Sequence, residues 1–514
     1  MDALTRRPAV LWLVIFTVLY VFAGGRWGIP VAAWLAPVFA IRFIRDSKSG
    51  WRAFFWIWLA AAVATIIASH HTTTLHFQSE LIEPALFAVM SLPILIPFVV
   101  DRLFHRRWAS GGPGPFWLTF VYPISFTAMD FASAIGSPLG SWGSLAYSQA
   151  GSTVFMQLTA ITGMSGITFI VSWFASVANY AWEGGFQWSK INRAVVVFAG
   201  VILIVFGYGY GRLALVEPGE QTVQVGGFSL PLREVGSMND LWKLGAEEEY
   251  HEAFKALNRR QLAQVRVMAQ DGAKIVVLQE VAVQGLQEEV AAMLENAAGI
   301  AREEGIYLAL PTGTIVPDGQ YENVVRIFDP NGEVVLEHYK FGGAQFEGSV
   351  PGNGVLQIVE TPYGKLSAAI CWDADFPDIV RQAGAQDVDL LLLPSNDWFE
   401  IREIHPGMAT FRAVENGMPI FRQTGNGVST VIDAYGRVTN RMDMHAEGDP
   451  DTWGAVQMVN VPVGSVATLY PKTGDVLGLA MVAGFFGLLA FAWIRRKPER
   501  SKSDSTTTSP PDAM

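Results

Sequence analysis

Long apolar runs, separated by short polar breaks, fill the first 212 residues of this 514-residue chain. Each run is close to the roughly 20 residues that an α-helix needs to cross a hydrocarbon core of ~30 Å. We read seven runs, at residues 8–24, 28–44, 53–69, 83–100, 114–134, 154–182 and 194–211. The pattern predicts that residues 1–212 form a membrane domain with seven transmembrane helices.

The rest of the chain divides into three parts. Residues 213–470 have the mixed composition of a globular domain, and residues 473–494 form an eighth apolar run. Residues 495–514 are polar and rich in Ser, Thr and Pro, which predicts a disordered tail. Over the whole chain only 16% of residues are charged, against about 25% in soluble proteins, and this agrees with a membrane protein.

Basic residues occupy alternate breaks between the runs. They precede the first run and lie between runs two and three, four and five, and six and seven: Arg6, Arg7, Arg42, Arg45, Lys48, Arg52, Arg102, Arg106, Arg107, Lys190 and Arg193. The other breaks hold one basic residue, Arg26. Because Lys and Arg favour the cytoplasmic side, the N-terminus is predicted to be cytoplasmic and residues 213–470 to lie outside the membrane. The basic stretch RRKPERSK after the eighth run predicts a cytoplasmic C-terminus.

Charge and cysteine content exclude several classes of function. The net charge is −11 and no basic patch is visible, so a nucleic-acid partner is not expected. One cysteine cannot form an internal disulfide. Eight scattered histidines and no paired cysteine spacing give no metal-binding motif. We therefore expect neither a metal ion nor an organic cofactor.

The globular part reads as alternating strands and helices. Continuous apolar runs such as KIVVLQE, LSAAICW and DVDLLLLPS are typical of buried central strands. Long amphipathic stretches, AEEEYHEAFKALNRRQLAQVRVMAQDG and LQEEVAAMLENAAGIAREEG, predict helices, and a DPNG turn joins two further strands. These features predict an α/β domain with antiparallel strands and helices on the outside.

Three chemically active side chains follow apolar runs in this domain: Glu280, Lys340 and Cys371. An unpaired cysteine is more often a small buried hydrophobe than a nucleophile, and a strand-ending Glu or Lys is usually solvated. The three together are a sufficient set for acyl transfer. A carboxylate can accept the thiol proton, and an ammonium can stabilise the oxyanion that forms when the thiolate attacks a carbonyl.

The order Glu280, Lys340, Cys371 resembles the triad of the nitrilase, or carbon–nitrogen hydrolase, superfamily, which implies an αββα sandwich. The stretch LLLLPSNDW and residues 405–438 carry further similarity. A nitrilase-like domain between a seventh and an eighth span, with membrane segments at 136–149 and 155–180, resembles the apolipoprotein N-acyltransferase family. That family moves an acyl chain from a phospholipid to the N-terminal amine of a diacylglyceryl-cysteine lipoprotein.

The resemblance implies a role for each matching residue. Cys371 would form a thioester with the acyl chain, Glu280 would be the general base, and Lys340 would hold the oxyanion. Glu347, in KFGGAQFEG, matches an additional glutamate of the family. The resemblance also implies a bacterial inner membrane, with the catalytic domain on the periplasmic or extracellular side, and both phospholipid and lipoprotein as partners. The oligomeric state cannot be read from the sequence.

Two positions beside the triad depart from the family pattern. The chain has Leu278-Gln279-Glu280 where the family usually has Trp-Pro-Glu. It has Cys371-Trp372-Asp373 where the family usually has Cys-Tyr-Glu. Trp372 keeps an aromatic wall and Asp373 keeps a negative charge, so both are expected to support the site. Substrate identity is the property that these changes leave open.

Further expectations follow from the aromatic and charged residues around the site. Apolar loops at 341–346 and 397–404 are expected to keep water from a thioester. Asp130, in the fifth run, is a charged residue at membrane depth, which is either functional or held at the interface by water. Two alternative functions stay open: a membrane-tethered amidase or nitrilase that acts on a small amide, and a non-catalytic sensor or lipid-binding scaffold.

Overall fold

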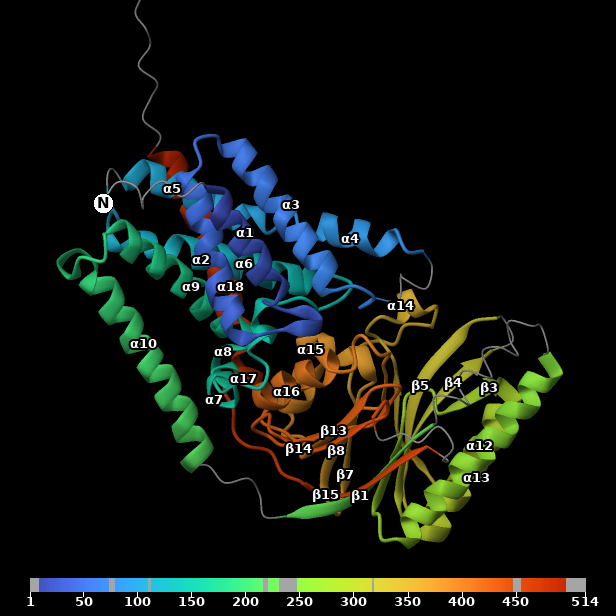
Figure 1. Ribbon diagram of the computed structural model, residues 1–514. Coiled ribbons are helices and arrows are strands. Elements are labelled where there is room, and N and C mark those ends of the chain that lie inside the picture. Colours follow the sequence, from blue (N-terminus) through green and yellow to red (C-terminus); the bar gives the residue numbers. More distant parts are fainter. Residues whose placement is uncertain are drawn as a thin grey trace, which may run out of the picture.

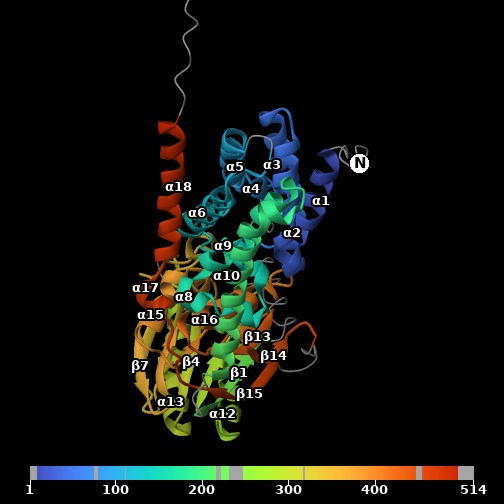
Figure 2. The same ribbon diagram turned by 90° about the vertical axis from the view of Figure 1, so that its left-hand side faces the viewer.

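The structure is a computed structural model that describes residues 9–73, 79–109, 112–215, 221–230, 247–316, 319–446 and 454–495. A helical part occupies one end of the molecule and an α/β sandwich occupies the other (Figures 1 and 2). The first described residues and the end of the last helix both lie at the end far from the sandwich (Figure 2). Residues 496–514, predicted to be disordered, lie outside the described residues.

A helix occupies each of the eight predicted runs. The helices of this part are α1 (Ala9–Val21), α2 (Pro30–Asp46), α3 (Gly50–Ala68), α4 (Ile82–Met90), α5 (Leu95–Trp108), α6 (Val121–Gly136), α7 (Thr153–Met156), α8 (Thr159–Thr162), α9 (Met164–Glu183), α10 (Trp188–Leu215) and α18 (Val476–Ile494). Among the described residues, five helices are long and apolar enough to cross a membrane, or six if the pair bent by 119° at Gly163 is one span. The count of eight spans stays a prediction.

The breaks between apolar runs that carry Lys and Arg lie together, at the end of the helical part far from the sandwich. Arg102 Nη2 donates a hydrogen bond to the Ser47 carbonyl over 2.6 Å, which joins the ends of α5 and α2. Arg45 pairs with Asp101 at 2.7 Å. Arg107 Nη1 donates to the carbonyl of Ala492, near the end of α18, over 2.8 Å. Segments that are predicted to share one side of the membrane are therefore neighbours in space.

Two sheets form the α/β part. The first has the strand order β15-β1-β2-β4-β5-β6, with β3 paired to β4. Its strands are β1 (Thr222–Ser229), β2 (Ile275–Leu278), β3 (Val283–Leu286), β4 (Tyr307–Ile315), β5 (Tyr321–Phe328), β6 (Val334–Tyr339) and β15 (Ala455–Pro462). The second has the order β14-β13-β11-β9-β8-β7. Its strands are β7 (Ile358–Thr361), β8 (Gly364–Ala368), β9 (Leu390–Leu392), β11 (Ile420–Arg422), β13 (Val428–Ile432) and β14 (Val438–Asp443).

The sheets and helices stack in four layers, which confirms the predicted αββα sandwich. One core cluster joins residues of both sheets, for example Val277 of β2 and Leu392 of β9. A second cluster packs α12 (Glu247–Gln270) and α13 (Gln287–Glu304) on the first sheet. A third packs α15 (Pro377–Ala385) and α16 (Ile404–Asn416) on the second. The apolar strands are buried on both faces because a helix layer or the other sheet covers each one.

The two parts of the chain meet at a continuous seam. Phe411 of α16 packs in one core cluster with membrane-part residues and lies edge-on to Tyr147, with ring centroids 5.0 Å apart. The amide and hydroxyl of Ser141 donate to the Asp375 carbonyl over 2.8 and 2.6 Å. Trp398 Nε1 donates to the His71 carbonyl over 2.7 Å. The seam brings the loop after α3 to the same place as the loops after β8 and β9.

Candidate functional site

The three predicted triad residues come from both sheets. Glu280 lies two residues after β2, and Lys340 directly follows β6 of the same sheet. Cys371 follows β8 of the other sheet and begins the short 3-10 helix η5 (Cys371–Asp375). Cys371 and Val281 have positive φ angles of 44° and 54°, a conformation that costs energy in residues other than glycine. Strain of this kind is typical of functional sites, and here it lies at Cys371 itself and directly after Glu280.

Lys340 is the centre of the site. Its ammonium Nζ donates to Glu280 Oε1 over 2.7 Å and to Glu347 Oε2 over 2.5 Å. The Lys340 side chain is fully buried, whereas Glu347, on the short helix α14 (Ala344–Glu347), is partly exposed. Burial acts to lower the pKa of Lys340, but the carboxylates of Glu280 and Glu347 raise it well above its ordinary value. The ammonium therefore stays charged at neutral pH.

Asn323 of β5 fixes the orientation of Glu280. Asn323 Nδ2 donates to Glu280 Oε1 over 2.7 Å, and the Lys340 amide donates to the Asn323 carbonyl over 2.9 Å. Within the part of the chain that the structure describes, the hydrogen bonds from Asn323 and Lys340 to the Glu280 carboxylate end on Oε1. Neither of these two donors engages the second oxygen, Oε2.

Cys371 is buried, with 8% of its surface exposed, and its Sγ lies 3.8 Å from the Asn396 carbonyl oxygen. Burial and the negative charge of Glu280 raise the pKa of the thiol, while Lys340 and His405 lower it, and the net pKa is above the ordinary value. The structure thus brings Glu280, Lys340 and Cys371 within electrostatic reach of one another. A neutral thiol at rest needs a base before it can attack a carbonyl.

His405 belongs to the same group of side chains, and the sequence pattern did not reveal it. One ring nitrogen of His405, Cys371 Sγ and an oxygen of Asp397 all lie within 4.8 Å of one another. His405 Nδ1 is 2.8 Å from Asp397 Oδ1, and Nε2 is 3.6 Å from Asp375 Oδ2. Burial acts to lower the pKa of His405, but Asp375 and Asp397 raise it well above its ordinary value. A second cation therefore stands beside the thiol.

His405 was not predicted from the sequence because, unlike the triad residues, it does not follow an apolar strand. It lies at the start of α16, at the first position of the stretch 405–438. Its partner Asp397 accepts from Arg422 Nη2 at both carboxylate oxygens, over 2.8 Å each. These residues are separated in the sequence and only the fold joins them.

Asp373 and Trp372 occupy different places beside Cys371. Asp373 accepts hydrogen bonds from the amides of Ile370, Phe341 and Gly342 over 2.8, 3.0 and 2.6 Å, and from His338 Nε2 over 2.8 Å. It therefore ties the loop after Lys340 to the loop that carries Cys371. The Trp372 ring lies against Gly343, where a Cβ would approach the ring to 2.0 Å, and stacks on Phe346.

The cavity at Cys371 is small, about 20 Å³, which is little more than the space of one water molecule. Trp142 and Thr72 come to it from the membrane part, and Trp372, Trp398 and His405 from the sandwich. Of the two loops expected to cap the site, 397–404 contributes Trp398 to the lining. Phe341 and Phe346 of the other loop are 40% and 41% exposed. An acyl chain therefore requires side chains at this cavity to move.

Two groups of side chains among the described residues have the spacing of metal ligands. One is Cys371, Asp397 and His405, and the other is His70, His71 and Glu80. The first does not suit a metal ion, because Arg422 engages both oxygens of Asp397 and the raised pKa of His405 keeps a proton on a ring that must be neutral to bind.

Asp130, singled out in the fifth run, lies on α6 and is held by three hydrogen bonds. Ser144 Oγ and Thr168 Oγ1 donate to Oδ2 over 2.8 and 2.9 Å, and the Leu145 amide donates to Oδ1 over 3.1 Å. Protein groups thus satisfy this carboxylate, and it orients the loop that begins η4 (Leu145–Gln149).

Two family models match the chain. One, described as the apolipoprotein N-acyltransferase N-terminal domain, matches residues 16–177. The other, carbon-nitrogen hydrolase, matches residues 240–469. An apolipoprotein N-acyltransferase of Geobacter metallireducens is 24% identical over 96% of this chain and 97% of its own length. A second, of Allorhizobium ampelinum, is 25% identical over 70% of this chain and 71% of its own length.

Among solved structures, an amidase from Nesterenkonia sp. is similar to part of this chain. It has 19% sequence identity and a TM-score of 0.37, and the match covers 52% of this chain and 97% of the amidase.

Proposed function

The chain belongs to the apolipoprotein N-acyltransferase family, a family of bacterial membrane enzymes, and from that membership we propose how its site carries out lipoprotein N-acylation. Cys371 takes an acyl chain from a phospholipid as a thioester and passes it to the N-terminal amine of a diacylglyceryl-cysteine lipoprotein. One observation carries the proposal. A buried ammonium, held by Glu280 and Glu347, lies beside the single cysteine at the seam with the membrane helices.

In the first half-reaction, Oε2 of Glu280 accepts the thiol proton while Sγ of Cys371 attacks the ester carbonyl carbon of the phospholipid. The Lys340 ammonium stabilises the oxyanion that forms. The carbon–oxygen bond then breaks, and the leaving alkoxide takes the proton from Glu280. The products are the acyl-enzyme thioester and a lysophospholipid.

In the second half-reaction, the neutral α-amine of the lipoprotein attacks the thioester carbonyl. Glu280 accepts a proton from the attacking nitrogen, and Lys340 again stabilises the oxyanion. The carbon–sulfur bond breaks, the amide forms, and Glu280 returns the proton to Cys371 Sγ. No external oxidant or energy source is needed, because one acyl bond replaces another.

The small cavity at Cys371 supports transfer in preference to hydrolysis. A thioester exposed to water would hydrolyse, and a cavity of about 20 Å³ walled by Trp142, Trp372 and Trp398 leaves little room for water. The position of the cavity at the seam supports a donor that arrives from the membrane.

We also propose that the sandwich lies on the periplasmic or extracellular side and that both termini are cytoplasmic. The clustering of the basic breaks at the opposite end of the molecule supports this orientation, because basic residues favour the cytoplasmic side. We further propose the division into a membrane domain, residues 1–212, a catalytic domain, residues 213–470, and a last span, residues 473–494.

The proposal is tested with purified full-length protein, a phospholipid labelled in its acyl chain and a diacylglyceryl-cysteine peptide. We expect label on the protein when the peptide is absent, and transfer of that label to the peptide amine when it is added. A membrane-tethered amidase would instead release ammonia from small amides and acquire no lipid label. A non-catalytic scaffold would do neither, and either result would contradict the proposal.

The charges around the thiol predict opposite effects of three substitutions on its pKa. Glu280 raises the pKa of Cys371, so Glu280→Gln should lower it and speed alkylation by iodoacetamide near pH 8. Lys340 and His405 lower the same pKa, so Lys340→Met and His405→Gln should slow alkylation. Glu280→Gln should nevertheless slow acyl transfer by roughly 10²–10⁴-fold, because the base is lost.

The measurement is the alkylation rate of Cys371 against pH, followed by mass spectrometry on the single cysteine of the chain. Glu322→Gln, which removes a carboxylate next to Asn323 in the sequence, is a matched control and should leave the profile unchanged. If acyl transfer by Glu280→Gln ran at the wild-type rate, the proposed base would be wrong.

A further inference from the structure

A cavity of about 340 Å³ lies at the seam, apart from the small cavity at Cys371. The loop around η1 (Gly25–Trp27), the end of α3 and the loop that begins η4 wall it from the membrane part, and α16 walls it from the sandwich. An adjoining cavity of about 210 Å³ lies between α3, α4 and α6. Trp142 borders both cavities and also the one at Cys371, so its side chain is part of the wall of all three spaces.

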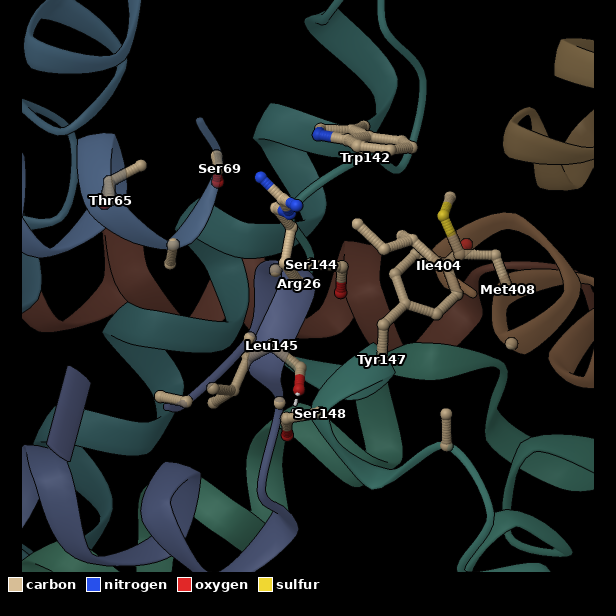
Figure 3. A pocket seen from close by; sticks show the side chains of 18 of the residues that line it. Arg26, Thr65, Ser69, Trp142, Ser144, Leu145, Tyr147, Ser148, Ile404 and Met408 are labelled. Carbon is tan, nitrogen blue, oxygen red and sulfur yellow. Dashed lines mark hydrogen bonds between the residues drawn. The ribbon is translucent and has the colours of Figure 1, made fainter. Parts of the chain in front are cut away.

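The two larger cavities share part of their walls, since Asp130, Ser144 and Phe126 border both. Phe87, Met90, Ile94 and Phe126 supply apolar surface to the adjoining cavity. The 340 Å³ cavity has hydroxyl groups and charges, and Figure 3 shows Arg26 among the side chains that line it, with Ser144 and Ser148. A space lined by Arg26 beside one lined by Phe87, Met90 and Ile94 suits a molecule with an anionic headgroup and hydrocarbon chains.

Of the charged side chains that line this cavity, Arg26 is the one that the described residues leave available to a ligand. Asp130 accepts three hydrogen bonds from protein donors, and Glu403 pairs with Arg441 at 2.7 Å. Among the described residues, Arg26 Nη1 donates to the neutral carbonyl of His70 over 3.3 Å, and the guanidinium lies over the Trp27 ring, 5.5 Å from its centroid. Within the described part of the chain, no carboxylate forms a salt bridge with Arg26. Its guanidinium thus keeps donors free for an anion in the cavity.

The sequence pattern also sets Arg26 apart. It is the one basic residue in the three breaks of residues 1–212 that are predicted to face outward. A basic residue at that place works against the orientation that the other breaks favour. The anion of a phospholipid headgroup is its phosphate, and a guanidinium binds phosphate through two parallel hydrogen bonds.

We propose that the 340 Å³ cavity binds the phosphate of the acyl-donor phospholipid through Arg26, with its hydrocarbon chains directed past Trp142 toward Phe87 and Met90 of the adjoining cavity. This inference rests on the proposed function and names the part of the donor that the enzyme recognises. We assign the donor and not the acceptor to this cavity, because a guanidinium attracts the phosphate of the donor and has no such attraction for an amine.

The test compares Arg26→Gln and Arg26→Lys with the wild type in formation of the acyl-enzyme. We expect Arg26→Gln to raise the phospholipid concentration for half-maximal acylation tenfold or more, while the maximal rate changes less than threefold. The rise should be similar for phosphatidylethanolamine and phosphatidylglycerol, which share the phosphate. Arg26→Lys should retain most of the affinity. Arg381→Gln, which removes an exposed arginine paired with Asp378, is the matched control.

Three further measurements check that Arg26 acts on the phosphate of the donor. Diacylglycerol, an acyl donor without phosphate, should acylate the wild type and Arg26→Gln equally. Glycerol 3-phosphate at millimolar concentration should compete with phospholipid if the cavity binds free phosphate esters. It should not compete if binding also needs the lipid chains. Arg26 is the phosphate ligand in both cases. The alkylation rate of Cys371 should be the same in Arg26→Gln and the wild type, which shows that the site is intact.

The inference is overturned if Arg26→Gln leaves the phospholipid concentration for half-maximal acylation unchanged. It is also overturned if Arg26→Gln changes the acceptor concentration for half-maximal transfer instead, or if it slows acylation by diacylglycerol as much as acylation by phospholipid. Failure of the proposed function looks different. In that case the wild type itself acquires no acyl label from any phospholipid.

Discussion

Replacement of Cys371 by alanine is expected to lower acyl transfer by at least about a thousand-fold and to remove the acyl label from the protein. The thiol is the only group among the triad residues that can carry the acyl chain between donor and acceptor as a thioester. Because the chain has one cysteine, the label has one possible thioester position. Mass spectrometry of the protein after incubation with phospholipid should show one added acyl chain in the wild type and none in Cys371→Ala.

Cys371→Ser is the conservative control for this result. A serine hydroxyl is less acidic and less nucleophilic than a thiol, so its acylation should be slow, and the product should be an oxygen ester. Hydroxylamine at neutral pH should release the acyl chain rapidly from the wild type and slowly from Cys371→Ser. Acyl transfer that survives in Cys371→Ala would show that the chain passes directly from donor to acceptor, and the thioester mechanism would be abandoned.

Replacement of Lys340 by methionine should have the second largest effect, on stability as well as on activity. Methionine has a similar volume but no charge, and it leaves Glu280 and Glu347 without the ammonium that each contacts. Breaking a buried ion pair by removing one partner costs about 3–5 kcal/mol. Loss of the group that we propose to stabilise the oxyanion should also lower acyl transfer by about 10²–10³-fold. Thermal unfolding in detergent and single-turnover acylation measure the two effects.

A second substitution separates these two roles of Lys340. Glu347→Gln removes one of the two carboxylates, so the double variant Lys340→Met/Glu347→Gln should regain part of the stability lost in Lys340→Met. It should regain none of the activity, because the cation at the oxyanion is still absent. Full activity in a folded Lys340→Met protein would show that Lys340 has a structural role alone.

Much of the architecture could be predicted because it follows from local patterns. A run of about 20 apolar residues and a cluster of basic residues each act on the membrane independently of the rest of the chain. The strands KIVVLQE and LSAAICW are apolar throughout because helices or the other sheet cover both faces. Glu280 and Cys371 were found for the same reason, since each stands just past a run that is easily recognised.

The parts that escaped prediction depend on contacts between distant residues. Asp373 was expected to support the site through its charge, yet its carboxylate is used to bind three backbone amides and His338. Gln279, which stands where the family usually has proline, accepts a hydrogen bond from the Leu230 amide over 2.6 Å. His405 follows a loop with no regular pattern, and its place beside Cys371 requires the fold of α16 against the second sheet.

From the sequence alone we predicted which segments enter the membrane, which form the layered sandwich, and which three side chains make up a set suited to acyl transfer. These properties depend on the hydropathy and charge of short segments, and on residue types at strand ends. Only the tertiary structure decided that Lys340 contacts two carboxylates, that His405 joins the thiol, and that Arg26 lines a cavity next to Trp142. Distances between side chains depend on packing across the whole molecule, and no short segment contains that information.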